Sequence, residues 1–261
     1  MKIGLVLSGG GFRGIAHIGV VRALDEFDFQ ITHIAGTSAG AVIGALYAGG
    51  LNWKQILEFI KEVNIFSLNN YALGKPGFVD TEKLYDHFSV FFPEDNFESL
   101  KIPLFITATD ILEGSLKVFS KGELIRPILA SAAFPGVFTP VKIADSYYVD
   151  GGALNNFPVD LIKDHCKEII GVYVNPFVKV EIDQLKYAYK VLERAYQIRA
   201  AKDSLPKFGD CSLVISPKDL INHRTFSIKD MDTVFNLGYE TAIRALENST
   251  KLQKPKETDL K

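Results

Sequence analysis

A short apolar strand that runs directly into a glycine-rich turn and then a helix opens the chain. Residues 3–7 form an uninterrupted apolar run, as expected of a strand buried on both faces of a parallel sheet. The turn that follows carries Gly9, Gly11 and Gly14, and residues 14–27 place apolar side chains at helical intervals. This order favours folds in which a parallel sheet is covered by helices.

The rest of the chain continues the alternation. Further strands are predicted at 31–35, 103–110, 168–174 and 212–216, with a hairpin or two short strands at 140–149. Further helices are predicted at 38–48, from Asn52 onward, and at 80–91, 122–133, 182–202 and 228–247. We therefore predict one three-layer α/β domain with a mostly parallel central sheet over residues 1–249. The polar, Pro-broken segment 250–261 is predicted to be a frayed tail.

Composition narrows the possible partners. The net charge of −2 and the lack of a basic stripe argue against a nucleic-acid partner. Cys166 and Cys211 have no metal-like spacing and are predicted to be thiols in a reducing compartment. The longest apolar stretch, 39–51, is too short to span a bilayer. We expect a cytoplasmic protein with at most transient, peripheral membrane contact, and we predict no oligomeric state.

The G-x-G-x-x-G spacing of the first turn is also found in dinucleotide-binding proteins. That fingerprint needs an acidic residue about 20 residues on, at the end of the second strand. Here the second predicted strand is followed by Gly36, Thr37 and Ser38, and Asp28 lies before it. A nucleotide-dependent oxidoreductase is therefore disfavoured, and neither a cofactor nor a metal is predicted.

The segment "GTSAG", Gly36 to Gly40, is a G-x-S-x-G between a predicted strand and a predicted helix. This context indicates a nucleophile elbow, whose tight turn exposes the serine hydroxyl and requires small neighbours. Ser38 is then a candidate nucleophile, with a plain tight turn as the alternative. The exposed amides of Gly9, Gly10 and Gly11 become candidate oxyanion-hole donors. Arg13 either orients this loop or is a solvated cation.

A serine nucleophile needs a proton acceptor. Of the five histidines, only His165 and His223 come late enough in the chain for a common triad, and His165 is predicted within a helix. His17 is more consistent with packing or a backbone hydrogen bond. No histidine stands in a motif. "DGG", Asp150 to Gly152, follows a strand, and its carboxylate is either a base or a structural turn aspartate.

Four segments in this order resemble the patatin-like phospholipases, a family of lipid acyl hydrolases: "GGGFRG", "GTSAG", "ASAAFPGVF" at 130–138 and "DGG". The resemblance covers residue 3 to about 160. It implies a Ser–Asp dyad of Ser38 and Asp150, an oxyanion hole at Gly9 to Gly11, and a turn shaped by Pro135. It also implies cleavage of lipid esters through an acyl-enzyme, without a metal.

The supporting residues carried by these motifs are Arg13, Gly36, Gly40, Gly151 and Gly152. The partner implied is a lipid or another ester, and a catalytically silent lipid-binding or regulatory protein of the same fold is the alternative. Residues 56–92 are rich in large apolar side chains, which indicate either core packing or an acyl-binding surface. Within them, residues 64–79 are the lid candidate.

Overall fold

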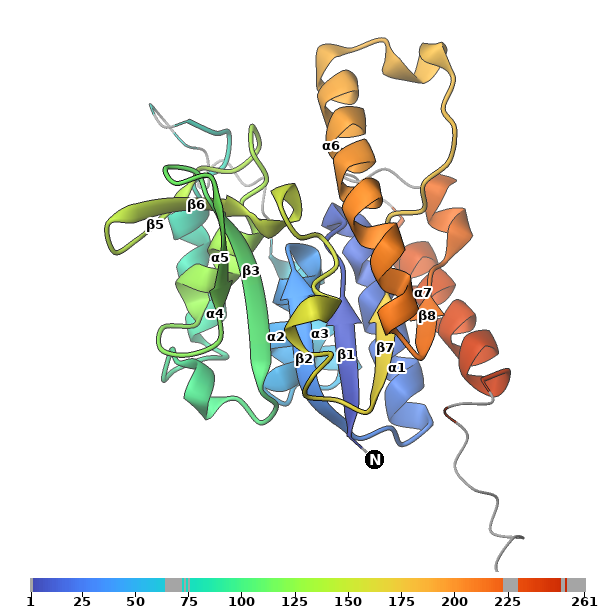
Figure 1. Ribbon diagram of the computed structural model, residues 1–261. Coiled ribbons are helices and arrows are strands. Elements are labelled where there is room, and N and C mark those ends of the chain that lie inside the picture. Colours follow the sequence, from blue (N-terminus) through green and yellow to red (C-terminus); the bar gives the residue numbers. More distant parts are fainter. Residues whose placement is uncertain are drawn as a thin grey trace, which may run out of the picture.

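The computed structural model describes residues 2–63, 72, 74, 76–222, 230–249 and 252. Within them a single sheet runs through the molecule (Figure 1). Its strands are β1 (Ile3–Leu7), β2 (Ile31–Thr37), β3 (Leu104–Asp110), β4 (Ser115–Phe119), β5 (Val141–Ile143), β6 (Ser146–Asp150), β7 (Glu168–Val172) and β8 (Leu213–Ile215). The helices are α1 (Ile15–Glu26), α2 (Ala39–Ala48), α3 (Trp53–Glu62), α4 (Tyr85–Ser89), α5 (Ile125–Ala132), α6 (Ala188–Ser204) and α7 (Met231–Glu247).

The centre of the sheet is parallel. β1 pairs in parallel with β2 and β7, β2 with β3, and β7 with β8. β4, β5 and β6 pair antiparallel at one side. The predicted mixed α/β fold with a mostly parallel sheet is confirmed. β4 was not predicted, because its sequence, SLKVF, is largely exposed and lacks the apolar run of the central strands.

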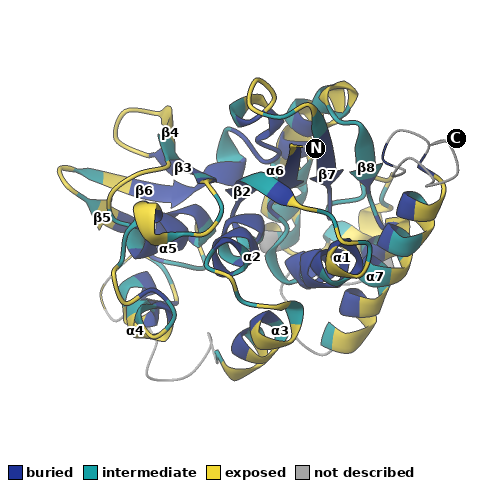
Figure 2. Cartoon of the chain, turned by 90° about the horizontal axis from the view of Figure 1, so that it is seen from below, coloured by how far each residue is buried: buried dark blue, intermediate teal, exposed yellow. Residues whose placement is uncertain are grey.

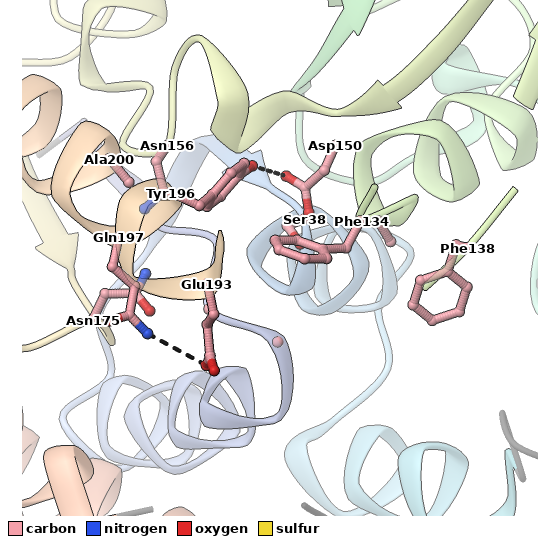
Figure 3. Close-up of a pocket in the computed structure, with 13 residues that line it drawn as sticks. Ser38, Phe134, Phe138, Asp150, Asn156, Asn175, Glu193, Tyr196, Gln197 and Ala200 are labelled. Atoms are coloured by element: carbon pink, nitrogen blue, oxygen red, sulfur yellow. Dashed lines mark hydrogen bonds between the residues drawn. The ribbon is translucent and has the colours of Figure 1, made fainter. Parts of the chain in front are cut away.

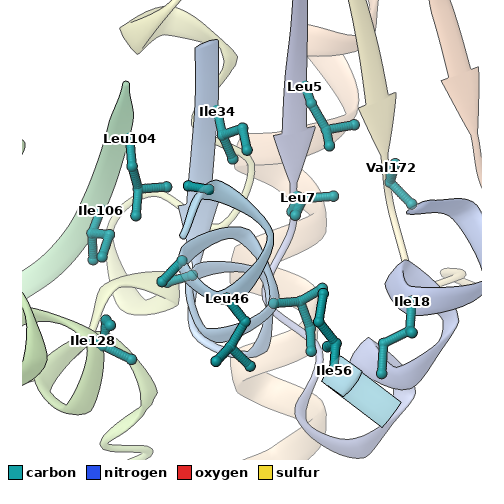
Figure 4. Close-up of a cluster of buried hydrophobic side chains, with 14 of the residues drawn as sticks. Leu5, Leu7, Ile18, Ile34, Leu46, Ile56, Leu104, Ile106, Ile128 and Val172 are labelled. Carbon is teal, nitrogen blue, oxygen red and sulfur yellow. The ribbon is translucent and has the colours of Figure 1, made fainter. Parts of the chain in front are cut away.

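The sheet is covered on both faces, but unequally. Helices α1, α2, α5 and α7 lie together on one face, as the view in Figure 2 shows. The main core lies between these helices and the sheet (Figure 4), and includes Leu5, Leu7, Ile18, Ile34, Leu46, Ile106, Ile128 and Val172. On the other face, Val6 and Ala35 pack in a smaller cluster with Phe157 and Ile162, which follow the "DGG" turn, and with Phe208.

The register of β3 brings two strand ends together. Thr37 at the end of β2 pairs with Thr107, and Asp150 at the end of β6 pairs with the next residue, Ala108. β2 runs parallel to β3 and β6 runs antiparallel to it, so the two strands approach one another head-on along β3. The residues that follow these ends, Ser38 among them, therefore meet although more than a hundred positions separate them.

Helices α1 and α7 approach closely at two glycines. A Cβ on Gly19 would overlap the carbonyl oxygen of Phe235 and lie 2.6 Å from the amide nitrogen of Tyr239. A Cβ on Gly238 would overlap the carbonyl oxygen of Ala16. Because the obstructing atoms are backbone, neither helix can give way by rotating a side chain, so any side chain here must push the helices apart.

We expect Gly19→Ala to lower the free energy of unfolding by about 2–3 kcal/mol, since overpacking outweighs the gain in helix propensity. Urea denaturation measures this directly. Gly209→Ala is the matched control, because a Cβ there meets no atom within 4 Å. Equal free energies of unfolding for the two variants would show that α1 and α7 can move apart at no measurable cost.

One further expectation, the helix at His165, is wrong, and two others, the frayed tail and the lid, fall largely outside the described residues. His165 lies in an exposed turn after Ile162, not in a helix. The tail falls outside the described residues except for Leu252, which is buried and whose amide donates to Ser249 Oγ at 3.3 Å. Of the lid candidate, residues 64–71, 73 and 75 also lie outside the described residues. Within the described parts of the chain, no helix has the length and apolar character needed to cross a membrane.

Candidate active site

Ser38 occupies a strained turn between β2 and α2. Its φ of 54° and ψ of −126° put it in the left-handed half of backbone space, which a residue with a Cβ rarely adopts. The turn closes only because its neighbours are small. A Cβ on Gly36 would lie 2.6 Å from the carbonyl oxygen of Gly40, and a Cβ on Gly40 would overlap that of Leu7. This geometry matches the elbow predicted from "GTSAG".

The segment "ASAAFPGVF" supports this turn from α5. The amide of Ser38 donates to Ser131 Oγ at 2.8 Å, which satisfies the first amide of the elbow. Pro135 then occupies the second position of a turn closed by a 3.1 Å hydrogen bond from the Val137 amide to the Phe134 carbonyl. Gly136 has a φ of 83° at the third position, as a type II turn requires.

Asp150 follows β6 and is buried, with 3% of its surface exposed. It accepts hydrogen bonds from the Gly152 amide at 2.7 Å and from the Tyr196 hydroxyl at 3.4 Å, and the Ser38 side chain lies near enough to help stabilise its charged form. Figure 3 shows the carboxylate between Ser38 and Tyr196. Burial raises the pKa of Asp150 to about 6, while these hydrogen bonds oppose that rise. Gly151 packs against the carbonyl of Thr107, where a Cβ would not fit.

The glycine loop beside Ser38 differs from the prediction at one residue. The amide of Gly9 donates to the carbonyl of Asn156 at 3.2 Å, so its single N–H is already used and Gly9 is removed from the candidate donors. Gly10 and Gly11 line the cavity over Ser38. Among the described residues no acceptor is found for either amide. The loop therefore keeps two of the three predicted candidate donors, Gly10 and Gly11.

Arg13 and His17 hold this loop from within the protein. Arg13 is buried, which lowers its pKa, while the negative charge of Glu193 opposes that shift; it is not the solvated cation of the alternative interpretation. His17 is fully buried and its Nε2 lies 2.8 Å from the carbonyl oxygen of Ser8. Burial lowers the pKa of His17 to about 4, so the ring is neutral near pH 7 and makes the predicted backbone hydrogen bond, which opposes that shift.

The other histidines give no candidate base. His165 stacks on His33, with ring centroids 5.4 Å apart, and lies next to the beginnings of β2 and β7, at the opposite end of the sheet from Ser38. His223 lies outside the described residues. In the described part of the chain, no histidine lines either cavity that reaches Ser38.

Two cavities of different character meet at Ser38. The first, about 80 Å³, holds Asp150 and is lined by a mixture of polar side chains, Asn156, Asn175, Glu193 and Gln197, and apolar ones, among them Phe134, Phe138 and Ala200. The second, about 130 Å³, lies between α2, α3 and the glycine loop and is lined mainly by apolar residues: Phe12, Ile15, Val42, Ile43, Ile60, Ala132 and Phe138. It adjoins a third cavity of about 80 Å³ that shares Val42, Ile60, Ala132 and Phe138 and extends to Phe59 and Phe88.

Three residues that support this site were not predicted from the sequence. Ser131 holds the elbow, the carbonyl of Asn156 holds Gly9, and Tyr196 reaches Asp150 from α6. Ser131 and Asn156 stand inside the quoted motifs or just after them, which could have drawn attention to them. Tyr196 lies in a C-terminal helix whose sequence shows no motif.

The fold and the site together define a class of protein. It consists of three-layer α/β proteins with a serine on a strand-to-helix turn, beside a buried carboxylate, at the carboxyl edge of a parallel sheet. A family model for patatin-like phospholipases matches residues 5–162. The chain belongs to the patatin-like phospholipase family, as the resemblance of its motifs implied.

Relatives and solved structures agree with this assignment. An uncharacterized NTE family protein of Mycobacterium tuberculosis is 36% identical over 163 residues, covering 60% of this chain and 44% of that protein. Lysophospholipase NTE1 of Debaryomyces hansenii is 34% identical over 180 residues, covering 66% of this chain and 12% of that protein. The chain thus spans less than half the length of these relatives.

Two solved structures share the fold at low sequence identity. VipD from Legionella pneumophila has a TM-score of 0.59 at 16% identity, covering 95% of this chain and 67% of that one. The type III effector protein ExoU has a TM-score of 0.51 at 16% identity, covering 97% of this chain and 54% of that one.

Proposed function

We propose that this protein is a serine lipid acyl hydrolase, in which Ser38 is the nucleophile and Asp150 is the base. The observation that carries the proposal is that the Ser38 side chain, on a strained elbow, and the buried Asp150 carboxylate line the same cavity, where Ser38 helps to stabilise the charged form of Asp150. An ordinary aspartate is too acidic to accept a serine proton near neutral pH. Burial of Asp150 moves its pKa to about 6, into the range useful to a general base.

The reaction proceeds in two halves. Asp150 takes the hydroxyl proton of Ser38 as Oγ bonds to the ester carbonyl carbon, and the amides of Gly10 and Gly11 stabilise the oxyanion that forms. The tetrahedral intermediate then collapses, the proton passes from Asp150 to the leaving alcohol, and an acyl-serine remains. Water, deprotonated by Asp150, adds to the acyl carbonyl and releases the fatty acid, which restores the Ser38 hydroxyl.

The two cavities suggest how an ester lies across Ser38. The apolar cavity between α2 and α3 suits the acyl chain, because its walls are aliphatic and aromatic. The cavity under α6, which has the polar side chains of Asn156, Asn175, Glu193 and Gln197 among its walls, suits an alcohol that carries hydrogen-bonding groups. A fatty-acid ester of a glycerol-like or phosphorylated alcohol fits both, and a relative with 34% identity over 180 residues is named a lysophospholipase.

Fatty-acid release from lysophosphatidylcholine and from p-nitrophenyl esters, followed by titration and absorbance, tests the proposed activity. We expect turnover of both, with the longer acyl chains preferred. Failure to hydrolyse any carboxylic ester, in a protein that is folded by circular dichroism, would overturn the proposal and favour the silent lipid-binding alternative.

Filling the apolar cavity is expected to change the preference for acyl-chain length. Val42 stands where the two apolar cavities meet, so Val42→Trp would close the deeper one. We expect kcat/KM for a dodecanoyl ester to fall at least tenfold relative to a butanoyl ester, about 1.4 kcal/mol of lost acyl-chain binding. Val191→Trp on the exposed side of α6 is the control. Equal losses for both esters would place the acyl chain elsewhere.

A further inference from the structure

Tyr196 brings a phenol hydroxyl to the carboxylate proposed as the base. It lies on the face of α6 that lines the cavity holding Asp150, and its hydroxyl is 3.4 Å from Asp150 Oδ1 (Figure 3). Its ring packs edge-on against Phe134, with centroids 4.9 Å apart. α6 begins at Ala188, beyond the residues that the family model matches. The contact thus comes from a part of the chain that the family motifs do not describe.

The second glycine of "DGG" makes room for this hydroxyl. A Cβ on Gly152 would lie 2.7 Å from Tyr196 Oη, 2.8 Å from Asn156 Oδ1 and 3.0 Å from Asp150 Oδ1, so a side chain there would crowd all three atoms. The Gly152 amide donates to the same oxygen, Oδ1, at 2.7 Å. Oδ1 is therefore held by two donors, and neither of them occupies Oδ2.

We propose that Tyr196 is a positioning residue, which holds Asp150 Oδ1 together with the Gly152 amide so that Oδ2 stays aligned with the Ser38 hydroxyl. The proposal rests on the proposed function of Ser38 and Asp150. A carboxylate can rotate about its last bond, and two donors on one oxygen restrict that rotation. Misalignment of a base by about 1 Å can lower a rate a hundredfold, so such restraint matters for catalysis.

The charged and titratable groups near Asp150 come from several elements. Ser38 faces it from the start of α2, and Tyr196 from α6, while Glu193 of α6 lines the same cavity. Burial and the negative charge of Asp150 raise the pKa of Tyr196 well above its ordinary value, against the positive charge of Arg199. The Tyr196 hydroxyl is therefore protonated at any pH at which the enzyme would work, and it acts as a donor.

The variant Tyr196→Phe removes only the hydroxyl and keeps the ring against Phe134. We expect kcat for a p-nitrophenyl ester to fall about tenfold at pH 7, with KM within twofold, because alignment and not binding is lost. We also expect the acid limb of the kcat–pH profile to move to higher pH, since the carboxylate loses a donor that favours its charged form. Tyr187→Phe, at an exposed tyrosine just before the same helix, is the control.

A double-mutant cycle with Gly152→Ala separates positioning from packing. If Gly152 is needed to admit the hydroxyl, Gly152→Ala should lower kcat less in the Tyr196→Phe background than in the wild type. Wild-type kcat and pH profile in Tyr196→Phe would overturn the positioning role, and so would a rise in KM alone. If Ser38→Ala is inactive, either result refutes only the role of Tyr196 and not the proposed function. If Ser38→Ala is active, both the proposed function and the role of Tyr196 are refuted.

Discussion

Replacing Ser38 by alanine should abolish ester hydrolysis while leaving the fold intact. The substitution removes one oxygen, the atom proposed to attack the ester carbonyl, and no other group described in either cavity stands in its place. We expect kcat/KM to fall by at least about 10³-fold, toward the background rate of the assay. The measurement is hydrolysis of a p-nitrophenyl ester under conditions in which the wild type turns over rapidly.

The fold should survive because the elbow does not depend on the lost hydroxyl. The amide of residue 38 still donates to Ser131 Oγ, and the close contacts of Gly36 and Gly40 are unchanged. We expect an unaltered circular dichroism spectrum and a midpoint of thermal unfolding close to that of the wild type. Ser120→Ala, at an exposed serine after β4, controls for contaminating esterases. Turnover by Ser38→Ala above a tenth of the wild-type rate would refute the assignment of the nucleophile.

The substitution Asp150→Asn should abolish activity and at the same time stabilise the protein. The amide has the shape of the carboxylate and still accepts from the Gly152 amide, but it cannot take a proton from Ser38. We expect kcat to fall by about 10³-fold, as is typical when a general base is removed. Hydrolysis by this variant within tenfold of the wild-type rate would show that another group is the base.

The stability effect follows from the raised pKa of Asp150. Its pKa in the folded protein is about 6, against an ordinary value of 3.8, because the charged form is buried. Protonation therefore favours the folded state, and this stabilisation is complete below about pH 4 and is lost as the pH rises through 6. The side chain introduced by Asp150→Asn carries no charge to bury, so above pH 7 we expect the variant to be more stable by as much as about 3 kcal/mol.

Urea denaturation at pH 4.5 and pH 8 measures this difference, provided that both proteins unfold in two states. The two free energies of unfolding should be close at the lower pH and should separate at the higher one. A variant less stable than the wild type at pH 8 would show that the carboxylate is held by compensating interactions stronger than its burial penalty. A variant that loses activity and gains stability is typical of a site where a functional group, here a buried charge, lowers the stability of the fold.

Much of the fold and the elbow around Ser38 could be predicted from local patterns, whereas the choice of Asp150 as the base came from the family resemblance. The apolar runs of β1, β2 and β7 identify buried parallel strands, and the small residues around Ser38 identify a tight turn. The capping-box spacing of Asn52 and Gln55 correctly marks the start of α3. Each of these signals lies within a few residues, because strand periodicity, turn sterics and helix capping are local effects.

What the sequence did not reveal depends on contacts between distant segments. Gly9 was predicted to be a free donor, and only the fold shows that Asn156 takes its amide. The proximity of Asp150 to Ser38 depends on β6 and β2 pairing with adjacent residues of β3, a matter of register that no motif encodes. Tyr196 reaches Asp150 across 46 positions, from a helix with no signature. The antiparallel β4 was missed because an exposed strand has little apolar signal.

The rate at which a fluorophosphonate labels the protein, measured by intact mass across pH 4.5 to 9, tests directly whether a carboxylate activates the serine. We expect one adduct, on Ser38, with a labelling rate that rises with pH around a midpoint near 6, the pKa of Asp150. In Asp150→Asn the rate should be at least about a hundredfold lower and independent of pH over that midpoint. Labelling of any other residue, or labelling of Asp150→Asn at the wild-type rate, would show that Asp150 does not activate Ser38.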